Sequence, residues 1–381
     1  MVTLFASATI SLLSDLLLLL PDPRHPSFRD NLMISAHHPH RLQLWHLHPP
    51  PLPSLSSVLL LSSTAVLGSF DLKTMDPLDF QLAPHSAPTE AYGAPIAYVD
   101  YSSGPSLTAA LQGCQIVISV LKILDPQAMI DTHLALLAAC VTAKISRFSP
   151  SDWSLGPLSH SQVDLLESRN QLWKSCSELA AEHGIYCADF QNGAFMNYFA
   201  QGKKFPNDKE GQAEEAYALG GLKDGMMLKY INLPSQKLII PLTSDGTPSL
   251  ITMTLLDDIG KFVAAAIDLP PEQWQGHLSM AGDTFTYEHV YSLMQDQGLV
   301  LPHETTTIDQ CQTLIDDLDK ALTHHFSLET LIEKMVAQMI QVHCRGEIGG
   351  GQLQPTLNQL CPEVKSTTIA EYLQRVYRSR T

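Results

Sequence analysis

Apolar and polar positions fall into regular blocks from about residue 94 onward, and the first blocks predict a strand, a short helix and a second strand. The first strand is the compact apolar run Ile96–Val99. The helix lies in "GPSLTAALQGC", with Ser106 as a possible N-cap and Gly113 as its stop. The run "QIVISVL" is rich in β-branched residues, which is typical of a strand covered on both faces.

The following blocks continue this alternation. In "DPQAMIDTHLALLAACVTAK", Asp125 is placed to cap a helix and Pro126 suits its first turn. "ISRFS" predicts a strand that ends at Pro150, because proline donates no ladder hydrogen bond. A helix in "ESRNQLWKSCSELAAEHG" and a strand in "IYCADFQ" come next. This β-α-β-α-β order predicts an α/β fold with a parallel sheet, which binds ligands at the carboxyl ends of its strands.

Beyond residue 200 the pattern is less regular and more helical. "KLIIPL" and "SLITMTLL" predict strands, whereas "DDIGKFVAAAID" predicts a helix that begins near Asp257 or Asp258. "FTYEHVYSLMQDQG" predicts another helix with Thr286 as its cap. The closing helix "TTIAEYLQRVY" has Thr368 and Glu371 at the spacing of a capping box.

The first ninety residues differ from the rest in composition. Residues 1–90 hold 11 of the 25 prolines and one glycine, Gly68, which predicts an irregular, low-complexity segment. Its run "SDLLLLL" is interrupted by Asp15 and follows no lysine or arginine, so we expect neither a signal peptide nor a membrane span. The clusters "HHPH" and "HLH" lack acidic or cysteine partners at ligand spacing, so we expect no metal site.

Charge and cysteine content narrow the classes of function. The net charge of −16 argues against nucleic-acid binding and against an anionic membrane surface. The seven cysteines never form a CxxC pair, which favours a reduced, cytoplasmic setting. The sequence contains no GxSxG, HExxH, Walker A or YxxxK motif. Trp153 and Trp173 are predicted to be packing groups rather than substrate platforms.

Five segments, taken in order, resemble the NmrA-like, isoflavone-reductase-like family of atypical short-chain dehydrogenases, especially its fungal members. They are "SLTAALQGCQIVISVL", "PQAMIDTHLALLAAC", "RFSPSDW", "FQNGAFMNYF" and "LLDDIGKFVAAAID". The resemblance covers roughly residues 94–300, and "LCPEVKSTTIAEYLQRVY" is similar to the family's closing helix.

That resemblance implies a Rossmann-like core over 94–200 that binds NADP or NAD, and a smaller α+β substrate-binding and C-terminal helical region over 201–381. Strands near 238–256 are able to rejoin the core. The exit loops after positions 121, 149 and 190 are expected to converge on one nucleotide-shaped crevice. The residues that the family pattern places at the cofactor are Asp100, Ser119, Val120, Leu121, Pro150, Ser151, Asp152, Asn192 and Gly193. The pattern also places Phe195 beside the substrate, and the apolar segment around 195–235 adds Met196 and Tyr198 as candidate substrate contacts. On local sequence alone, a simple turn after Pro150 is the favoured interpretation of Ser151 and Asp152, and the family resemblance reverses this preference.

The N-terminus departs from the family pattern. Family members begin with a strand and a GxxGxxG turn whose glycines let the backbone approach a pyrophosphate. No GxxGxxG precedes residue 94 here, so the N-terminal βαβ unit is expected to be degraded or missing. One hypothesis is that residues 1 to about 85 derive from a mis-predicted exon or a shifted reading frame, and the alternative is a decayed cofactor half; sequencing the transcript decides between them.

A second departure concerns catalysis. Reductases of the family carry a lysine early in the helix after the Pro-Ser-Asp loop, and this position falls on Arg169, with Lys174 as the alternative. The two lie about 140° apart around a helix, so they cannot both face the site. Arginine can clamp a ribose hydroxyl but cannot act as a general acid near neutral pH.

Three functional hypotheses remain open. The first is an NAD(P)H-dependent reductase acting on a small aromatic or polyketide-like metabolite of secondary metabolism, and the second is a non-catalytic dinucleotide sensor that regulates a partner protein. The third is an inactive remnant of either. Arg169 and the absent glycine-rich turn favour the second or third, whereas the apolar segment around 195–235 favours a small-molecule pocket.

Overall fold

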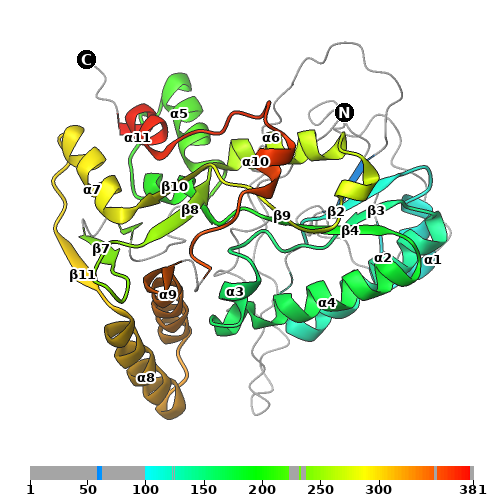
Figure 1. The fold of residues 1–381 in the computed structure, drawn as a ribbon, viewed down its shortest axis with the longest axis horizontal. Coiled ribbons are helices and arrows are strands. Elements are labelled where there is room, and N and C mark those ends of the chain that lie inside the picture. Colours follow the sequence, from blue (N-terminus) through cyan, green and yellow to red (C-terminus); the bar gives the residue numbers. More distant parts are fainter. Residues whose placement is uncertain are drawn as a thin grey trace.

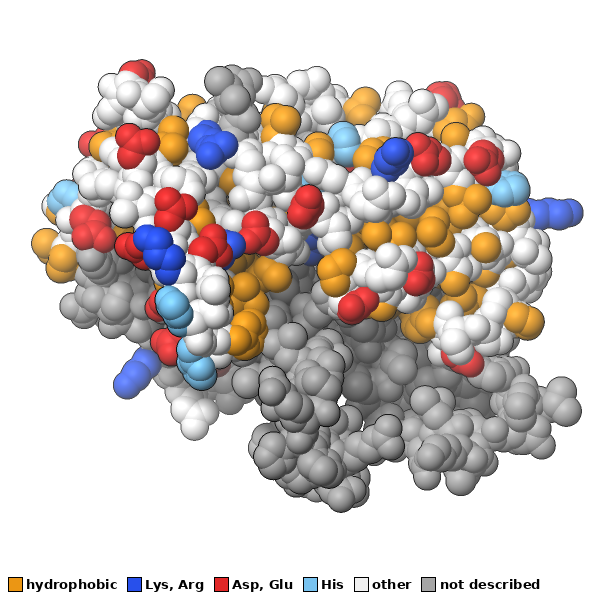
Figure 2. All heavy atoms as spheres, turned by 90° about the horizontal axis from the view of Figure 1, so that it is seen from below, with side chains coloured by type: hydrophobic (Ala, Val, Ile, Leu, Met, Phe, Trp, Pro, Cys, Tyr) orange, Lys and Arg blue, Asp and Glu red, His pale blue; other side chains and the backbone are white. Residues whose placement is uncertain are grey.

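The computed structural model describes residues 58–61, 99–121, 123, 125–222, 231–232, 237–346 and 350–377. Most of the expected strand at 96–99 lies outside this part of the chain, as do both histidine clusters and all of residues 1–90 except 58–61. No helix within it is both long and apolar enough to cross a bilayer. On the face shown in Figure 2, acidic and basic side chains of the described residues are interspersed and no basic patch gathers.

A five-stranded sheet in the order β1-β2-β3-β4-β9 forms one end of the molecule (Figure 1). Every neighbouring pair in it is parallel, which confirms the predicted α/β sheet. One strand, β1, comes from the segment expected to be irregular, and β9 was not predicted. The five strands are β1 Val58–Leu61, β2 Ile116–Ser119, β3 Arg147–Ser149, β4 Tyr186–Gln191 and β9 Gly276–Ser279.

Helices cover both faces of this sheet. On one face, α1 (Gly104–Ala110), α2 (Pro126–Ala143) and α4 (Glu167–Glu182) pack together around Val117 and Phe148. On the other face, α6 (Leu256–Ile267) packs in the cluster that holds Ile116 and Ile118. Neighbouring residues of β2 therefore enter different clusters, which explains why its sequence is apolar without alternation.

The helix starts follow the local sequence with one correction. Asp125 accepts a hydrogen bond from Ala128 N–H at 2.7 Å, with Pro126 in the first turn, as predicted. The cap of α1 is Ser103 rather than Ser106, whose hydroxyl accepts from Asp100 N–H instead. Helix α6 begins at Leu256, beside the predicted start near Asp257 or Asp258, and both aspartates lie in its first turn. Thr286 caps α7, and Thr368 with Glu371 forms the predicted capping box of α11.

The remaining elements build two smaller sheets and a helical C-terminal region. One sheet has the order β10-β8-β5 and the other β11-β7-β6. Their strands are β5 Ala194–Phe195, β6 Ile231–Asn232, β7 Lys237–Pro241, β8 Leu250–Thr254, β10 Asp283–Thr286 and β11 His303–Thr306. The helices are α3 Pro157–His160, α5 Lys209–Leu219, α7 Tyr287–Asp296, α8 Ile308–His324, α9 Leu328–Cys344, α10 Thr356–Leu360 and α11 Ile369–Tyr377, with short 3-10 turns at Asp164–Leu166, Met196–Ala200 and Pro271–Gln273.

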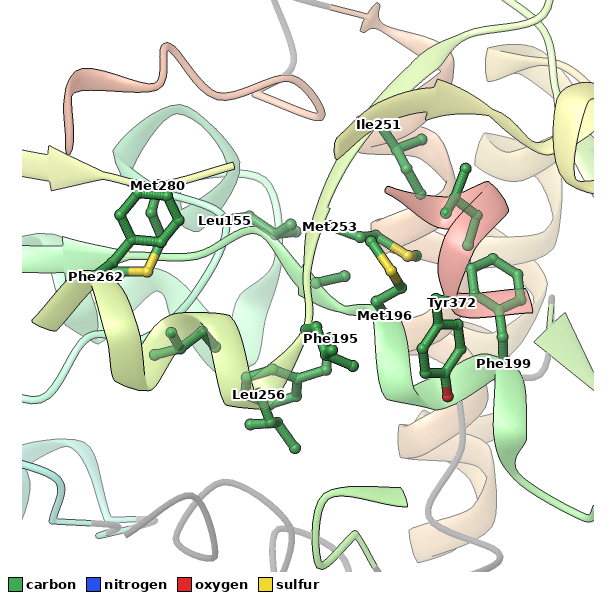
Figure 3. Close-up of a cluster of buried hydrophobic side chains, with 14 of the residues drawn as sticks. Leu155, Phe195, Met196, Phe199, Ile251, Met253, Leu256, Phe262, Met280 and Tyr372 are labelled. Atoms are coloured by element: carbon green, nitrogen blue, oxygen red, sulfur yellow. The ribbon is translucent and has the colours of Figure 1, made fainter. Parts of the chain in front are cut away.

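A continuous apolar core joins the smaller sheets to the large one. Figure 3 shows Ile251 and Met253 of β8 beside Met196, and Phe262 of α6 beside Met280. All five side chains are buried in one cluster. Strands β7 and β8 thus share a core with the large sheet, although their hydrogen bonds go to β5, β6, β10 and β11.

Candidate functional site

Three strand exits meet at one edge of the parallel sheet, and Trp153 joins them. Its indole Nε1 donates to the carbonyl oxygen of Ser119, the last residue of β2, at 2.9 Å. Its backbone N–H donates to Phe190 O, in β4, at 3.0 Å, and its ring stacks on Phe190 with centroids 5.2 Å apart. Trp153 itself belongs to the loop that follows β3. These contacts bring the three strand ends together, as expected, and the nucleotide-shaped crevice between them stays a prediction.

The backbone of Trp153 adopts an unusual conformation. Its φ of 52° lies in the left-handed region, which costs of order 1–3 kcal/mol for a side chain other than glycine. The hydrogen bonds to Ser119 and Phe190 hold the residue there. The packing role predicted for Trp153 is therefore combined with a linking role that the sequence did not reveal.

His133 of α2 holds the same loops in place. This α2 residue is fully buried, and its Nδ1 donates to Met129 O at 2.7 Å. Its Nε2 must then be the acceptor, and it receives Ser119 Oγ at 2.9 Å and Ser151 N–H at 3.3 Å. Burial lowers the pKa of His133 to about 4, so the ring is neutral near pH 7. Sequence reasoning missed this residue, whose signal was a single histidine on an apolar helix face.

Asp152 lies at the centre of a buried polar network. Ser154 Oγ donates to its Oδ1 at 2.6 Å, and His160 Nε2 lies 3.3 Å from the same oxygen while also contacting the Ser154 hydroxyl. Burial alone would raise the pKa of Asp152, but His160, Arg169 and Ser154 together hold it well below the usual range. The carboxylate is therefore ionised, and it anchors the loop rather than exchanging protons.

A second carboxylate, Asp189, lies close to this network on β4. Its Oδ1 is 2.7 Å from His277 Nδ1 on β9, and the His277 ring packs against Trp173 of α4. Burial and the nearby charge of Asp152 raise the pKa of Asp189 to about 6, although its hydrogen bond to His277 lowers it. Burial would lower the pKa of His277, yet the Asp189 carboxylate raises it overall. Neither residue was predicted; the period-two placement of Asp189 and Gln191 on one face of β4 was the available signal.

Arg169 and Lys174 occupy different faces of α4, as expected from their spacing. The Arg169 guanidinium donates to the backbone carbonyls of Ser151 and Asp152, and its Nη1 lies 3.5 Å from Asp152 Oδ1. Lys174 is exposed. Of the two candidates, only Arg169 reaches the loop after β3 in the described structure.

Asn192 and Gly193 form the exit of β4. Both backbone N–H groups donate to Ser154 O at 3.2 Å, and Thr254 Oγ1 donates to Asn192 O at 2.8 Å. Gly193 has a φ of 67°, and a Cβ there would lie 2.2 Å from Thr252 O, so only glycine fits. The side-chain Oδ1 of Asn192 is buried and has no hydrogen-bond donor among the described residues. It offers a ready acceptor to a bound amide or hydroxyl.

The remaining predicted residues are those placed at the cofactor and those placed at the substrate. Val120, Leu121 and Pro150 are buried beside the joined exits, whereas Asp100 is exposed and accepts from Ser102 in a turn before α1. The three predicted substrate contacts are largely core residues in this structure. Phe195 is 4% and Met196 0% exposed, Tyr198 packs on Phe195, and Figure 3 shows both of the buried pair within the apolar cluster.

No three histidine, cysteine, aspartate or glutamate side chains gather as a metal ligand set within the described ranges. Backbone amides, the Asn192 acceptor and the Arg169 cation are among the groups that the edge presents.

The comparisons with known proteins agree with this architecture. The model of the NmrA-like family matches residues 84–373. A comparison with curated protein sequences finds no match.

Several solved structures share the fold at low identity. A leucoanthocyanidin reductase from Vitis vinifera, solved as a ternary complex, is 15% identical with a TM-score of 0.51, over 77% of this chain and 89% of that one. An NADPH-dependent quinone oxidoreductase from Escherichia coli, solved with NADPH, is 17% identical with a TM-score of 0.50, over 76% and 86%. A triphenylmethane reductase from Citrobacter sp. is 11% identical with a TM-score of 0.51, over 77% and 86%. These likenesses establish the Rossmann-like fold.

Proposed function

Because the chain belongs to the NmrA-like family, we propose that it binds NADP(H) or NAD(H) where β2, β3 and β4 end, and that it reduces a small aromatic or polyketide-like metabolite. The observation that carries the proposal is the joining of the three strand exits through Trp153 and His133. Ligands of open parallel sheets bind at this edge. The NADPH bound to the similar Escherichia coli oxidoreductase supports the choice of ligand.

The first strand adds support. β1 pairs in parallel with β2, and its last residue, Leu61, is in register with Ser119. The chain therefore leaves β1 at the same edge as the other exits, where a Rossmann-like fold approaches a pyrophosphate. Residues 62–98, which follow Leu61, lie outside the described part.

Asn192, Gly193 and Arg169 each have a role in this proposal. The Asn192 Oδ1 atom accepts a hydrogen bond from an amide or hydroxyl of the dinucleotide, and Gly193 keeps the β4 exit close to β8. Arg169 stabilises the carbonyls of the loop after β3, and it supplies no proton because its guanidinium stays charged. When bound, the nicotinamide supplies the hydride, and the protein orients it and excludes water.

A second candidate function is a dinucleotide sensor without turnover that regulates a partner protein. The specific observation in its favour is that Arg169, at the position of the family's lysine, is engaged by two backbone carbonyls and cannot deliver a proton. The reductase needs a proton from the substrate or from solvent, whereas a sensor needs none.

Titration with NADPH, followed through nicotinamide fluorescence, tests both candidates. Lys174→Ala should bind NADPH as the unsubstituted chain does, because Lys174 is exposed on another face of α4. Saturable binding followed by NADPH consumption with a quinone or aromatic ketone supports the reductase. Equal affinity for NADPH and for NADP, the latter measured by displacement of bound fluorescent NADPH, without consumption supports the sensor. The absence of binding overturns both and leaves the inactive remnant.

A further inference from the structure

Two buried thiols meet where the α8–α9 hairpin joins β11. Cys311 lies in the first turn of α8 and Cys344 is the last residue of α9, and the two helices lie side by side in antiparallel order (Figure 1). Cys311 is 4% and Cys344 0% exposed. Both sulfurs contact Thr306 at the end of β11: Cys311 Sγ lies 3.6 Å from its Oγ1, and Cys344 Sγ lies 3.7 Å from its carbonyl oxygen.

The hairpin holds this meeting point firmly. Gln341, one turn before Cys344, donates to Ile308 O at 3.4 Å and to Gln312 Oε1 at 2.9 Å, so the last turn of α9 is fixed to the first turn of α8. Both thiols therefore lie against the same residue, Thr306, at the end of β11. Two sulfurs that contact one residue from neighbouring turns are placed to approach each other and form a bond.

The electrostatics of the two thiols differ from those of the other cysteines. The hydrogen bond from Cys344 lowers the pKa of Cys311 to about 7, and the same contact raises the pKa of Cys344. Burial instead raises the pKa of every other cysteine, namely Cys114, Cys140, Cys176, Cys187 and Cys361. A thiol with a lowered pKa beside a resolving thiol is the arrangement of redox-active cysteines.

We propose that Cys311 and Cys344 form a peroxide-oxidisable dithiol that closes to a disulfide between α8 and α9. The Cys311 thiolate attacks one oxygen of hydrogen peroxide, the O–O bond breaks, and a sulfenic acid forms with release of water after proton uptake. The Cys344 thiol then attacks the sulfenic sulfur and expels a second water. Two thiols and one peroxide thus give one disulfide and two waters, with two electrons passing to the peroxide. This proposal does not depend on dinucleotide binding.

The test uses the full chain, reduced and then exposed to equimolar hydrogen peroxide. Remaining thiols are alkylated, and a non-reduced digest is mapped by mass spectrometry. We expect one cross-linked peptide pair, Cys311 to Cys344, that dithiothreitol abolishes. Cys176 and Cys187 are the internal control, because they are buried in one apolar cluster yet both have raised pKa values. Full alkylation of Cys311 and Cys344 after peroxide, or equal cross-linking of the control pair, would overturn the proposal.

Single substitutions separate the two roles. Cys344→Ser should stop the reaction at the sulfenic acid, so that dimedone labels Cys311. Cys311→Ser should leave Cys344 unlabelled, and Cys361→Ser should still form the disulfide. Dimedone labelling of Cys344 in Cys311→Ser would contradict the assigned order of attack. The mapping of the unsubstituted chain stands even where a variant fails to fold.

Discussion

His133→Leu is the substitution that most sharply tests how the joined exits are held. Leucine fills a similar volume in the fully buried site, but it offers no acceptor to Ser119 Oγ or to the Ser151 N–H. Ser151 is itself buried, so its N–H is left without a partner or water. A buried donor without a partner costs about 1–3 kcal/mol, and the lost hydroxyl bond adds about 1 kcal/mol. We expect the free energy of unfolding near pH 7 to fall by about 2–4 kcal/mol.

The pH dependence of the free energy of unfolding gives a second, independent measure of the role of His133. The pKa of His133 falls from 6.5 to about 4 on folding, so the unfolded chain binds the proton more readily. Wild-type stability associated with this group is complete above pH 6.5 and is lost as the pH falls toward 4, by about 1.4 kcal/mol per pH unit and about 3 kcal/mol in all. Leucine has no such loss. The stability gap between wild type and His133→Leu should therefore narrow by about 2 kcal/mol between pH 6.5 and 5.

Urea unfolding at a series of pH values measures both effects. The urea midpoint of His133→Leu should be lower than that of wild type. The slope of free energy against urea concentration should change little, because unfolding exposes about the same surface in both proteins. His289→Leu is the matched control, since His289 is exposed on α7. His343, whose pKa burial also lowers to about 4, remains in both proteins and cancels in the difference. Equal stability of His133→Leu and wild type at pH 7, or parallel losses on acidification, would refute the reasoning.

Three further substitutions test neighbouring parts of the site. Trp153→Phe keeps the stacked ring but removes the indole donor, so we expect a loss of about 1 kcal/mol in urea unfolding and weaker NADPH binding in a fluorescence titration. Gly193→Ala should lower the free energy of unfolding by about 3–4 kcal/mol, because its Cβ meets a backbone oxygen. Gly221 also has a positive φ but open space around it, so Gly221→Ala should cost only about 1 kcal/mol. Similar losses in the two variants would rule out the close contact. The pKa of His277 by NMR should lie above about 6.5 and should fall in Asp189→Asn, and an unchanged value would contradict the ion pair.

The features that local sequence predicts well are those with short-range causes. The β2 strand, the Asp125 cap and the capping box at Thr368 depend on neighbouring residues alone, and the structure has all three. The cap of α1 was misassigned because Ser103 and Ser106 are both hydroxyl residues near the helix start. The β9 strand was missed because "GHLS" has no strand pattern, and it is held by pairing with β4, nearly ninety positions earlier.

The candidate site was less predictable because its contacts join distant segments. Trp153 bonds Ser119 across 34 positions and His133 meets Ser151 across 18, so no local pattern reveals either link. Family resemblance placed Phe195 at the substrate, and the apolar segment around it suggested Met196. The burial of both depends on packing against β8 and α11 residues that local sequence cannot place. The substrate roles of these two residues remain predictions that the described structure does not support directly.

Hydrogen–deuterium exchange with and without NADPH tests most directly whether the joined strand exits bind a dinucleotide. The account predicts that saturating NADPH slows exchange in peptides that contain residues 119–121, 150–153 and 192–193, and leaves those from the α8–α9 hairpin unchanged. Protection confined to other segments, or no protection at saturating NADPH, would contradict it.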